Sequence, residues 1–101
     1  MAAYWLARSI VNNPEEYKKY TDLVPDILKK YGGKVLARGG KQNQLEGNKH
    51  FLRHVVVEFP DLQAAEECFN SEEYQKARLF RLNGVGENEL LIVDGGDATI
   101  K

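Results

Sequence analysis

The feature that most constrains this chain is that its expected strands are apolar on both faces. Three runs rich in aromatic and β-branched residues, at 3–11, 51–59 and 89–94, are typical of strands. Side chains alternate between the two faces of a strand, so a sheet with one face in water should alternate apolar and polar residues. Instead, Leu6 points to one face and Trp5 to the other, and both are apolar. Both faces of the sheet must therefore be covered.

The segment between the first two strands predicts a helix with clear start and stop signals. Asn13 is a good N-cap, Pro14 suits the first helical position, and Glu16 completes a capping box. Apolar residues then recur at helical spacing until the Gly32-Gly33 pair, which ends the helix. Pro25 interrupts this stripe, so we expect a kink or a restart of the helix near Asp22.

The remaining segments complete a recognisable order of elements. Residues 34–38 predict a second, short strand, and Asp61 begins a second helix that breaks at 70–71 and continues over 72–82. The order strand, helix, strand, strand, helix, strand predicts an α+β fold, the ferredoxin-like βαββαβ, with a four-stranded antiparallel sheet and helices on one face. We expect one domain over residues 1–101, with 95–101 as a frayed tail.

The helices suffice for one face of this sheet, so we expect a second copy of the chain to cover the other. The expected partner is thus a homodimer joined through the sheet face. A chain of 101 residues buries only about two-thirds of its unfolded surface, and association would add to that burial.

Charge and cysteine content argue against several classes of protein. The net charge is −1 and the basic residues are dispersed, which argues against a nucleic-acid partner. Cys68 is the only cysteine, and His50 and His54 are poorly spaced, so we expect no metal site and no cofactor. No apolar run approaches the length of a membrane span, so we expect no membrane association and a cytoplasmic location.

Several short motifs, taken in order, resemble those of one family of small proteins. They are Tyr31-Gly32-Gly33-Lys34, Arg38-Gly39-Gly40, Glu46-Gly47, Val56-Val57-Glu58-Phe59-Pro60 and Ser71-Glu72-Glu73-Tyr74-Gln75. From about Tyr4 to Val93 the chain resembles the DUF1330 family, a domain of unknown function in the dimeric α/β-barrel superfamily. The resemblance implies a ferredoxin-like monomer whose sheet packs on the sheet of a partner. The chain departs from the family pattern at Cys68-Phe69, where an aromatic pair is common.

Three polar side chains on the expected central strands are candidates for catalysis. His54 lies in a β-branched run and shares a face with Glu58, so it could act as a general base whose tautomer Glu58 sets. Alternatively, it is a hydrogen-bonded histidine at the dimer seam. Arg8 could meet Glu58 or the carboxylate of a substrate, or form an ion pair across the subunit interface.

Three further residues are candidates for binding a ligand. Arg38 precedes Gly39-Gly40, where the backbone could approach a ligand closely, although a solvated arginine at a turn fits as well. Tyr74 follows the helix break, which could open space beside it, and Trp5 is either core or cavity lining.

Two functions from different classes are compatible with these residues. The first is a cofactor-independent enzyme, or a binder of a small organic carboxylate or aromatic molecule, with a pocket between sheet and helices near Arg8, His54, Glu58 and Tyr74. The second is a non-catalytic dimeric structural or interaction module, in which these polar groups satisfy one another at the seam. A cavity beside these residues would favour the first.

Overall fold

The sheet is built around β1 (Ala3–Val11), which pairs with a neighbour on each side. β3 (Arg53–Phe59) and β4 (Gly86–Asp94) flank it, and β2 (Lys34–Arg38) pairs with the outer edge of β3. All pairs are antiparallel and the strand order is β2-β3-β1-β4. This computed structural model, which describes residues 1–48 and 50–99, confirms the ferredoxin-like fold expected from the sequence.

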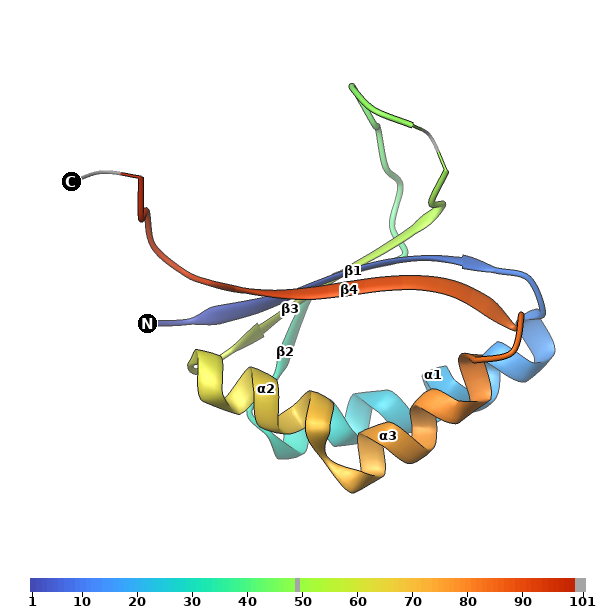
Figure 1. The fold of residues 1–101 in the computed structure, drawn as a ribbon, viewed down its shortest axis with the longest axis horizontal. Helices are drawn as coiled ribbons and strands as arrows, with labels where there is room; N and C mark the ends of the chain where they lie inside the picture. Colours follow the sequence, from blue (N-terminus) through green and yellow to red (C-terminus); the bar gives the residue numbers. More distant parts are fainter. Residues whose placement is uncertain (49, 100–101) are drawn as a thin grey trace.

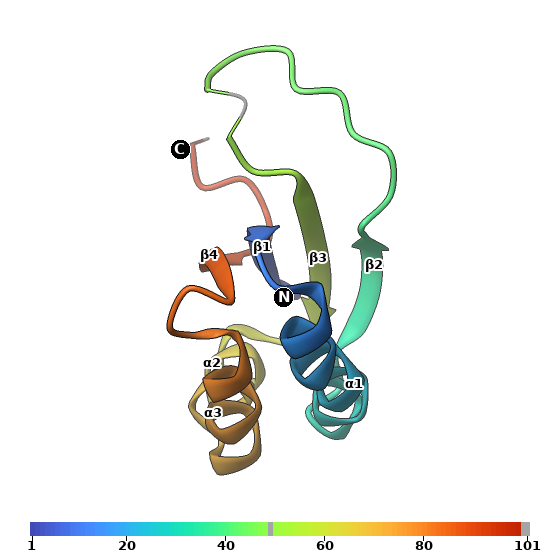
Figure 2. The ribbon, with the colours of Figure 1, turned by 90° about the vertical axis from the view of Figure 1, so that its right-hand side faces the viewer.

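The helices form a second layer on one face of the sheet. They are α1 (Pro14–Lys30), α2 (Leu62–Asn70), α3 (Glu72–Arg78) and a short 3-10 helix (Leu79–Arg81). Figures 1 and 2 show all of them on the same side, while residues 39–48 of the β2–β3 loop and residues 95–99 extend toward the opposite side. No helix of the described residues covers that opposite, open face. Nor is any of these helices long and apolar enough to cross a bilayer.

Helix α1 begins as the capping residues predict and continues through its proline. The side chain of Asn13 accepts a hydrogen bond of 3.2 Å from the amide of Glu16. The restart expected near Asp22 is absent, because the helix is continuous from Pro14 to Lys30. Pro25 removes one backbone hydrogen bond, but Leu28, one turn further on, is buried in the core and holds the last turn in place.

The break between α2 and α3 is confirmed, and a single serine stabilises both helix ends. Ser71 has an extended backbone, with ψ of 149°. Its hydroxyl donates to the carbonyl of Cys68 at 2.7 Å and accepts from the amide of Tyr74 at 3.2 Å. The start of α2 is capped as predicted, since Asp61 accepts from the amide of Ala64 at 2.8 Å.

Two strand boundaries differ from the sequence prediction because pairing decides them. β4 starts at Gly86, three residues before the expected Glu89. The reason is that β1 continues to Val11, which pairs with Gly86. β3 starts at Arg53 rather than Phe51. Of the tail expected to fray, residues 100–101 lie outside the described residues, whereas the amide of Gly95 donates to the carbonyl of Ala2 at 2.8 Å.

The aromatic core lies between the central strands and the α2–α3 pair. The ring of Trp5 lies 5.1 Å from that of Phe59 and 5.1 Å from that of Tyr74, measured between centroids. The indole N–H of Trp5 donates to the carbonyl of Ala65 at 3.0 Å. This bond satisfies the one polar group that the core tryptophan brings into the interior.

Cys68 is fully buried in this core, as expected for a small apolar residue rather than a reactive thiol. Burial, assisted by the negative charge of Glu73, raises the pKa of the thiol to about 12. At neutral pH the thiolate, which is the reactive form, is therefore scarce. We expect an aromatic disulfide reagent to modify Cys68 far more slowly in the native protein than in urea. Equal rates in the two conditions would contradict this placement.

Candidate functional site

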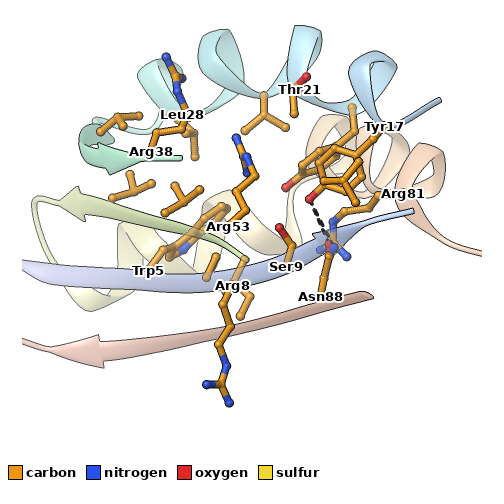
Figure 3. Close-up of a pocket in the computed structure, with 18 of the residues that line it drawn as sticks. Trp5, Arg8, Ser9, Tyr17, Thr21, Leu28, Arg38, Arg53, Arg81 and Asn88 are labelled. Carbon is orange, nitrogen blue, oxygen red and sulfur yellow. Dashed lines mark hydrogen bonds between the residues drawn. The ribbon is translucent and has the colours of Figure 1, made fainter. Parts of the chain in front are cut away.

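The polar residues expected to form one site lie on two opposite faces of the sheet. Trp5 is buried on the helix side, and alternation along β1 places Arg8 on the open face. Figure 3 shows the side chain of Arg8 directed away from the helices. His54, which is paired with Arg8, and Glu58 share its face. The expected pocket that joins these residues to Tyr74 is therefore not what the structure shows.

Arg8 has a carboxylate partner, but not the expected Glu58. Its Nη2 lies 2.7 Å from Oε1 of Glu89, and its Nε donates to the same oxygen at 2.8 Å. Arg8 and Glu89 are directly opposite each other on β1 and β4, which explains the pair. Glu58 lies opposite Tyr4, whose hydroxyl donates to it at 3.3 Å.

The structure separates His54 from Glu58, the carboxylate expected to assist it as a general base. Glu58 is on the same face but four residues along the strand, a separation of about 13 Å, so it does not set the tautomer of His54. The Nδ1 atom of His54 is buried and has no hydrogen-bond partner among the described residues. The catalytic roles of Arg8, His54 and Glu58 stay predictions.

A cavity of about 570 Å³ lies between α1 and the helix-facing side of the sheet. Its apolar wall includes Trp5, Leu28, Val35, Val57 and Leu90. Its polar lining includes Ser9, Tyr17, Tyr20, Arg38, Arg53, Arg81 and Asn88. Figure 3 shows the labelled lining residues around the space between α1 and the strands. Of the expected site residues, Trp5, Arg38 and Arg8 line the cavity, although the guanidinium of Arg8 points away from it to the open face. Tyr74, His54 and Glu58 are not part of the lining.

Arg81 is the most unusual group of the cavity. The residue is only 7% exposed, and no carboxylate of the described residues lies within ion-pair distance of it. Its Nη2 donates to the hydroxyl of Tyr74 at 3.3 Å, and its guanidinium carbon lies 5.1 Å from the ring centroid of Tyr20. The hydroxyls of Tyr20 and Tyr74 are 2.7 Å apart. A buried cation thus borders two linked phenol groups.

The surroundings of this group keep the guanidinium charged and Tyr20 neutral. Burial acts to lower the pKa of Arg81, but Tyr74 and Tyr20 outweigh it and the pKa lies above its usual value. Burial, together with Tyr74, raises the pKa of Tyr20 far above its usual range. The cavity therefore presents a permanent positive charge beside a neutral hydroxyl at neutral pH.

Sequence reasoning missed Arg81, Tyr20 and Arg53. Tyr20 lies on the apolar stripe of α1, and such a stripe predicts core residues rather than a site. A signal for Arg81 existed, since it follows Tyr74 and Ala77 at helical spacing and so falls on the buried face of the same helical piece. A charged residue at such a position needs either a partner or a ligand.

The cavity can hold a negatively charged organic molecule, but its lining offers few groups for acid–base chemistry. Glu89 borders it, yet the carboxylate of Glu89 is bound to Arg8 on the other face. Among residues 1–48 and 50–99, no three histidine, cysteine or acidic side chains gather where they could hold a metal ion. Apart from Lys18 and Glu89, which are ion-paired elsewhere, the polar groups that the lining offers a bound molecule are hydroxyls, the amide of Asn88 and arginines.

Comparisons with known proteins identify a family and a fold. The family model described as "Domain of unknown function (DUF1330)" matches residues 2–96. No curated protein matches the chain. Among solved structures, the RPA0582 protein of unknown function from Rhodopseudomonas palustris is 20% identical with a TM-score of 0.73, over 95% of this chain and 83% of that one.

Two other solved structures show how widely this fold is used. SnoaB from Streptomyces nogalater, described as a cofactor-independent oxygenase, is 11% identical with a TM-score of 0.62, over 99% of this chain and 98% of that one. The de novo designed protein Foldit4 is 13% identical with the same TM-score of 0.62, over 95% and 100%. At these identities the likeness concerns the fold alone, and one fold supports unrelated functions.

Proposed function

Because the chain belongs to the DUF1330 family, whose description assigns no function, we propose one from the site itself. The protein binds a small organic anion, a carboxylate or phenolate on an apolar or aromatic frame, in the cavity between α1 and the sheet. The apolar wall around Trp5 and Leu28 suits the frame, and the polar groups near Arg81 suit the charged end.

The observation that carries this proposal is the buried, unpaired Arg81. Moving a charge out of water is costly unless an opposite charge compensates it, and the described residues supply none. A guanidinium presents a planar set of donors that fits a carboxylate with two parallel hydrogen bonds. A bound anion would supply the missing counter-charge.

The likeness to SnoaB supports extending the proposal to chemistry without a cofactor. In such an enzyme Arg81 would stabilise negative charge that develops on the bound molecule, because a fixed donor in a dry site needs no reorganisation. The linked hydroxyls of Tyr20 and Tyr74 would orient the reacting group. Whether the protein only binds the anion or also transforms it, binding of the anion is the first step.

Replacing Arg81 with Gln should weaken the binding of benzoate and para-hydroxybenzoate by about tenfold to a hundredfold, the usual worth of a charged hydrogen bond. Titration calorimetry of the wild-type protein and of the variant measures this directly. Arg78→Gln removes the same charge outside the cavity lining and serves as the control. Failure of both probes to bind the wild type, or equal binding to Arg81→Gln, would refute the proposal.

We also propose that a second copy of the chain covers the open face of the sheet. Leu6, Leu91 and Val93 leave an exposed apolar stripe there. In such a dimer Arg8, His54 and Glu58 lie at the interface between the two sheets, where they form structural contacts instead of a catalytic site. The pairs that Arg8 forms with Glu89, and Tyr4 with Glu58, support that alternative over catalysis.

A further inference from the structure

We propose that the ligand of this cavity is a dianion, with one acidic group held at Arg81 and a second held by Arg38 and Arg53 across the cavity. This inference rests on the proposed function for its first anchor. It narrows the ligand from an organic anion to a molecule with two acidic groups on an apolar or aromatic frame.

The first argument is the charge balance of the lining. Arg38, Arg53 and Arg81 all line the cavity, and none has a carboxylate within ion-pair distance among the described residues. The other cationic residues of the lining differ, because Lys18 is bound to Asp22 at 2.8 Å and Arg8 is bound to Glu89. Arg38 is exposed and Arg53 is half-buried, so water rather than a protein carboxylate faces these two guanidinium groups, and a monoanion at Arg81 would leave both without a counter-charge.

The second argument is the separation of the arginines. Ser9 pairs with Arg53 on one side and with Asn88 on the other, so Arg53 and Asn88 are two strand spacings, about 10 Å, apart. Asn88 lies at the same side of the cavity as Arg81. It hydrogen-bonds the hydroxyl of Tyr17 at 3.1 Å, and the ring of Tyr17 packs at 5.4 Å on Tyr20, the ring beside Arg81.

Arg38 lies with Arg53 rather than with Arg81. Arg38 is on the edge strand β2 opposite Val55, and alternation puts Val55 on the same face of β3 as Arg53. In Figure 3 the side chains of Arg38 and Arg53 extend toward α1, on the far side of Ser9 from Arg81. Two positive groups therefore stand together at one side of the cavity and a third stands at the other.

Ser9 lies directly between Arg53 and Asn88, but much of the cavity wall beside these charges is apolar, and this wall suits the frame of the ligand. Trp5, Val57 and Leu28 are buried residues of the cavity wall. An aromatic or short hydrocarbon frame would displace water from this surface, and it would hold two acidic groups at a fixed distance. Rigidity of the frame reduces the entropy lost on binding.

Titration calorimetry at constant ionic strength, with two matched pairs of probes, tests this inference. Each pair consists of a diacid and its monomethyl ester. The ester has nearly the same shape as the diacid but carries one negative charge fewer. The two diacids are terephthalate and the longer biphenyl dicarboxylate. At least one diacid should bind the wild type about tenfold more tightly than its ester. The double variant Arg38→Gln/Arg53→Gln should lose that preference and bind the ester as before. Arg81→Gln should weaken both probes, and Arg78→Gln neither.

The outcomes separate this inference from the function on which it rests. If the esters bind through Arg81 and the diacids bind no more tightly, the second subsite is wrong and the proposed function stands. If the preference for a diacid survives in Arg38→Gln/Arg53→Gln, those two arginines do not form it and the assignment is wrong. If no diacid and no ester binds, the proposed function falls together with this inference.

Discussion

Replacing Leu6 with Glu should convert the protein from a dimer to a monomer, so that sedimentation equilibrium at micromolar concentration gives the chain mass instead of twice that mass. Leu6 is 40% exposed on the open face and lies between Val56 and Leu91 on the neighbouring strands. In a sheet-to-sheet dimer each copy would bury an unpaired carboxylate among apolar side chains, which costs several kcal/mol, on the order of the penalty for an uncompensated buried charge.

The control for this variant is Leu23→Glu. Leu23 is 46% exposed and lies on α1, away from the open face, so the same change there should leave the mass unchanged. Circular dichroism of Leu6→Glu separates dissociation from general unfolding. A wild-type protein that is fully folded and monomeric, or a Leu6→Glu protein that stays dimeric, would contradict the dimer.

Replacing Trp5 with Ala should destabilise the protein by about 3–5 kcal/mol, the usual cost of truncating a large core aromatic residue. Trp5 is 3% exposed, and its ring contacts Phe59, Phe69 and Tyr74. The change would leave a cavity at the centre of the aromatic core and remove the hydrogen bond to the carbonyl of Ala65. Small domains have only about 5–15 kcal/mol of stability in total, so this variant should be close to unfolded at moderate temperature.

Urea denaturation at fixed protein concentration measures this effect. Trp5→Phe keeps most of the ring volume but loses the N–H donor, so it should cost about 1–3 kcal/mol for the unsatisfied carbonyl. Leu36→Ala is the control, because Leu36 is 49% exposed and its truncation should change stability by less than about 0.5 kcal/mol. A loss below about 1 kcal/mol for Trp5→Ala would contradict its central place in the core.

The fold could be predicted from local signals that require no knowledge of distant contacts. Asn13 and Asp61 cap the two helical regions by bonds to amides three residues ahead. Ser71 interrupts the second helical region in the same local way. By contrast, the start of β4 at Gly86 depends on the length of β1, a partner far away in the sequence, and the prediction placed it too late.

The site was predicted less well because it depends on contacts between distant residues. Trp5 and Arg38 do line the cavity, and their roles in binding a ligand stay predictions. Arg81 was overlooked, although its helical spacing from Tyr74 placed it on a buried face. Its lack of a carboxylate partner, which makes it a candidate anchor, depends on every element that packs around it, and no local pattern reports this.

The sequence by itself determined that His54 and Glu58 share one face of their strand, and that Arg8 and Trp5 point to opposite faces of theirs, because alternation along a strand is a property of the backbone. The pairing of Arg8 with His54, which brings the three polar residues to one face, came from the tertiary structure. Only the tertiary structure decided which of the two faces the helices cover. Both faces carry large apolar residues, so the apolar pattern alone does not choose between them. The path of α1 and of the α2–α3 pair settles the choice, and it places the cavity beside Arg81 rather than beside His54.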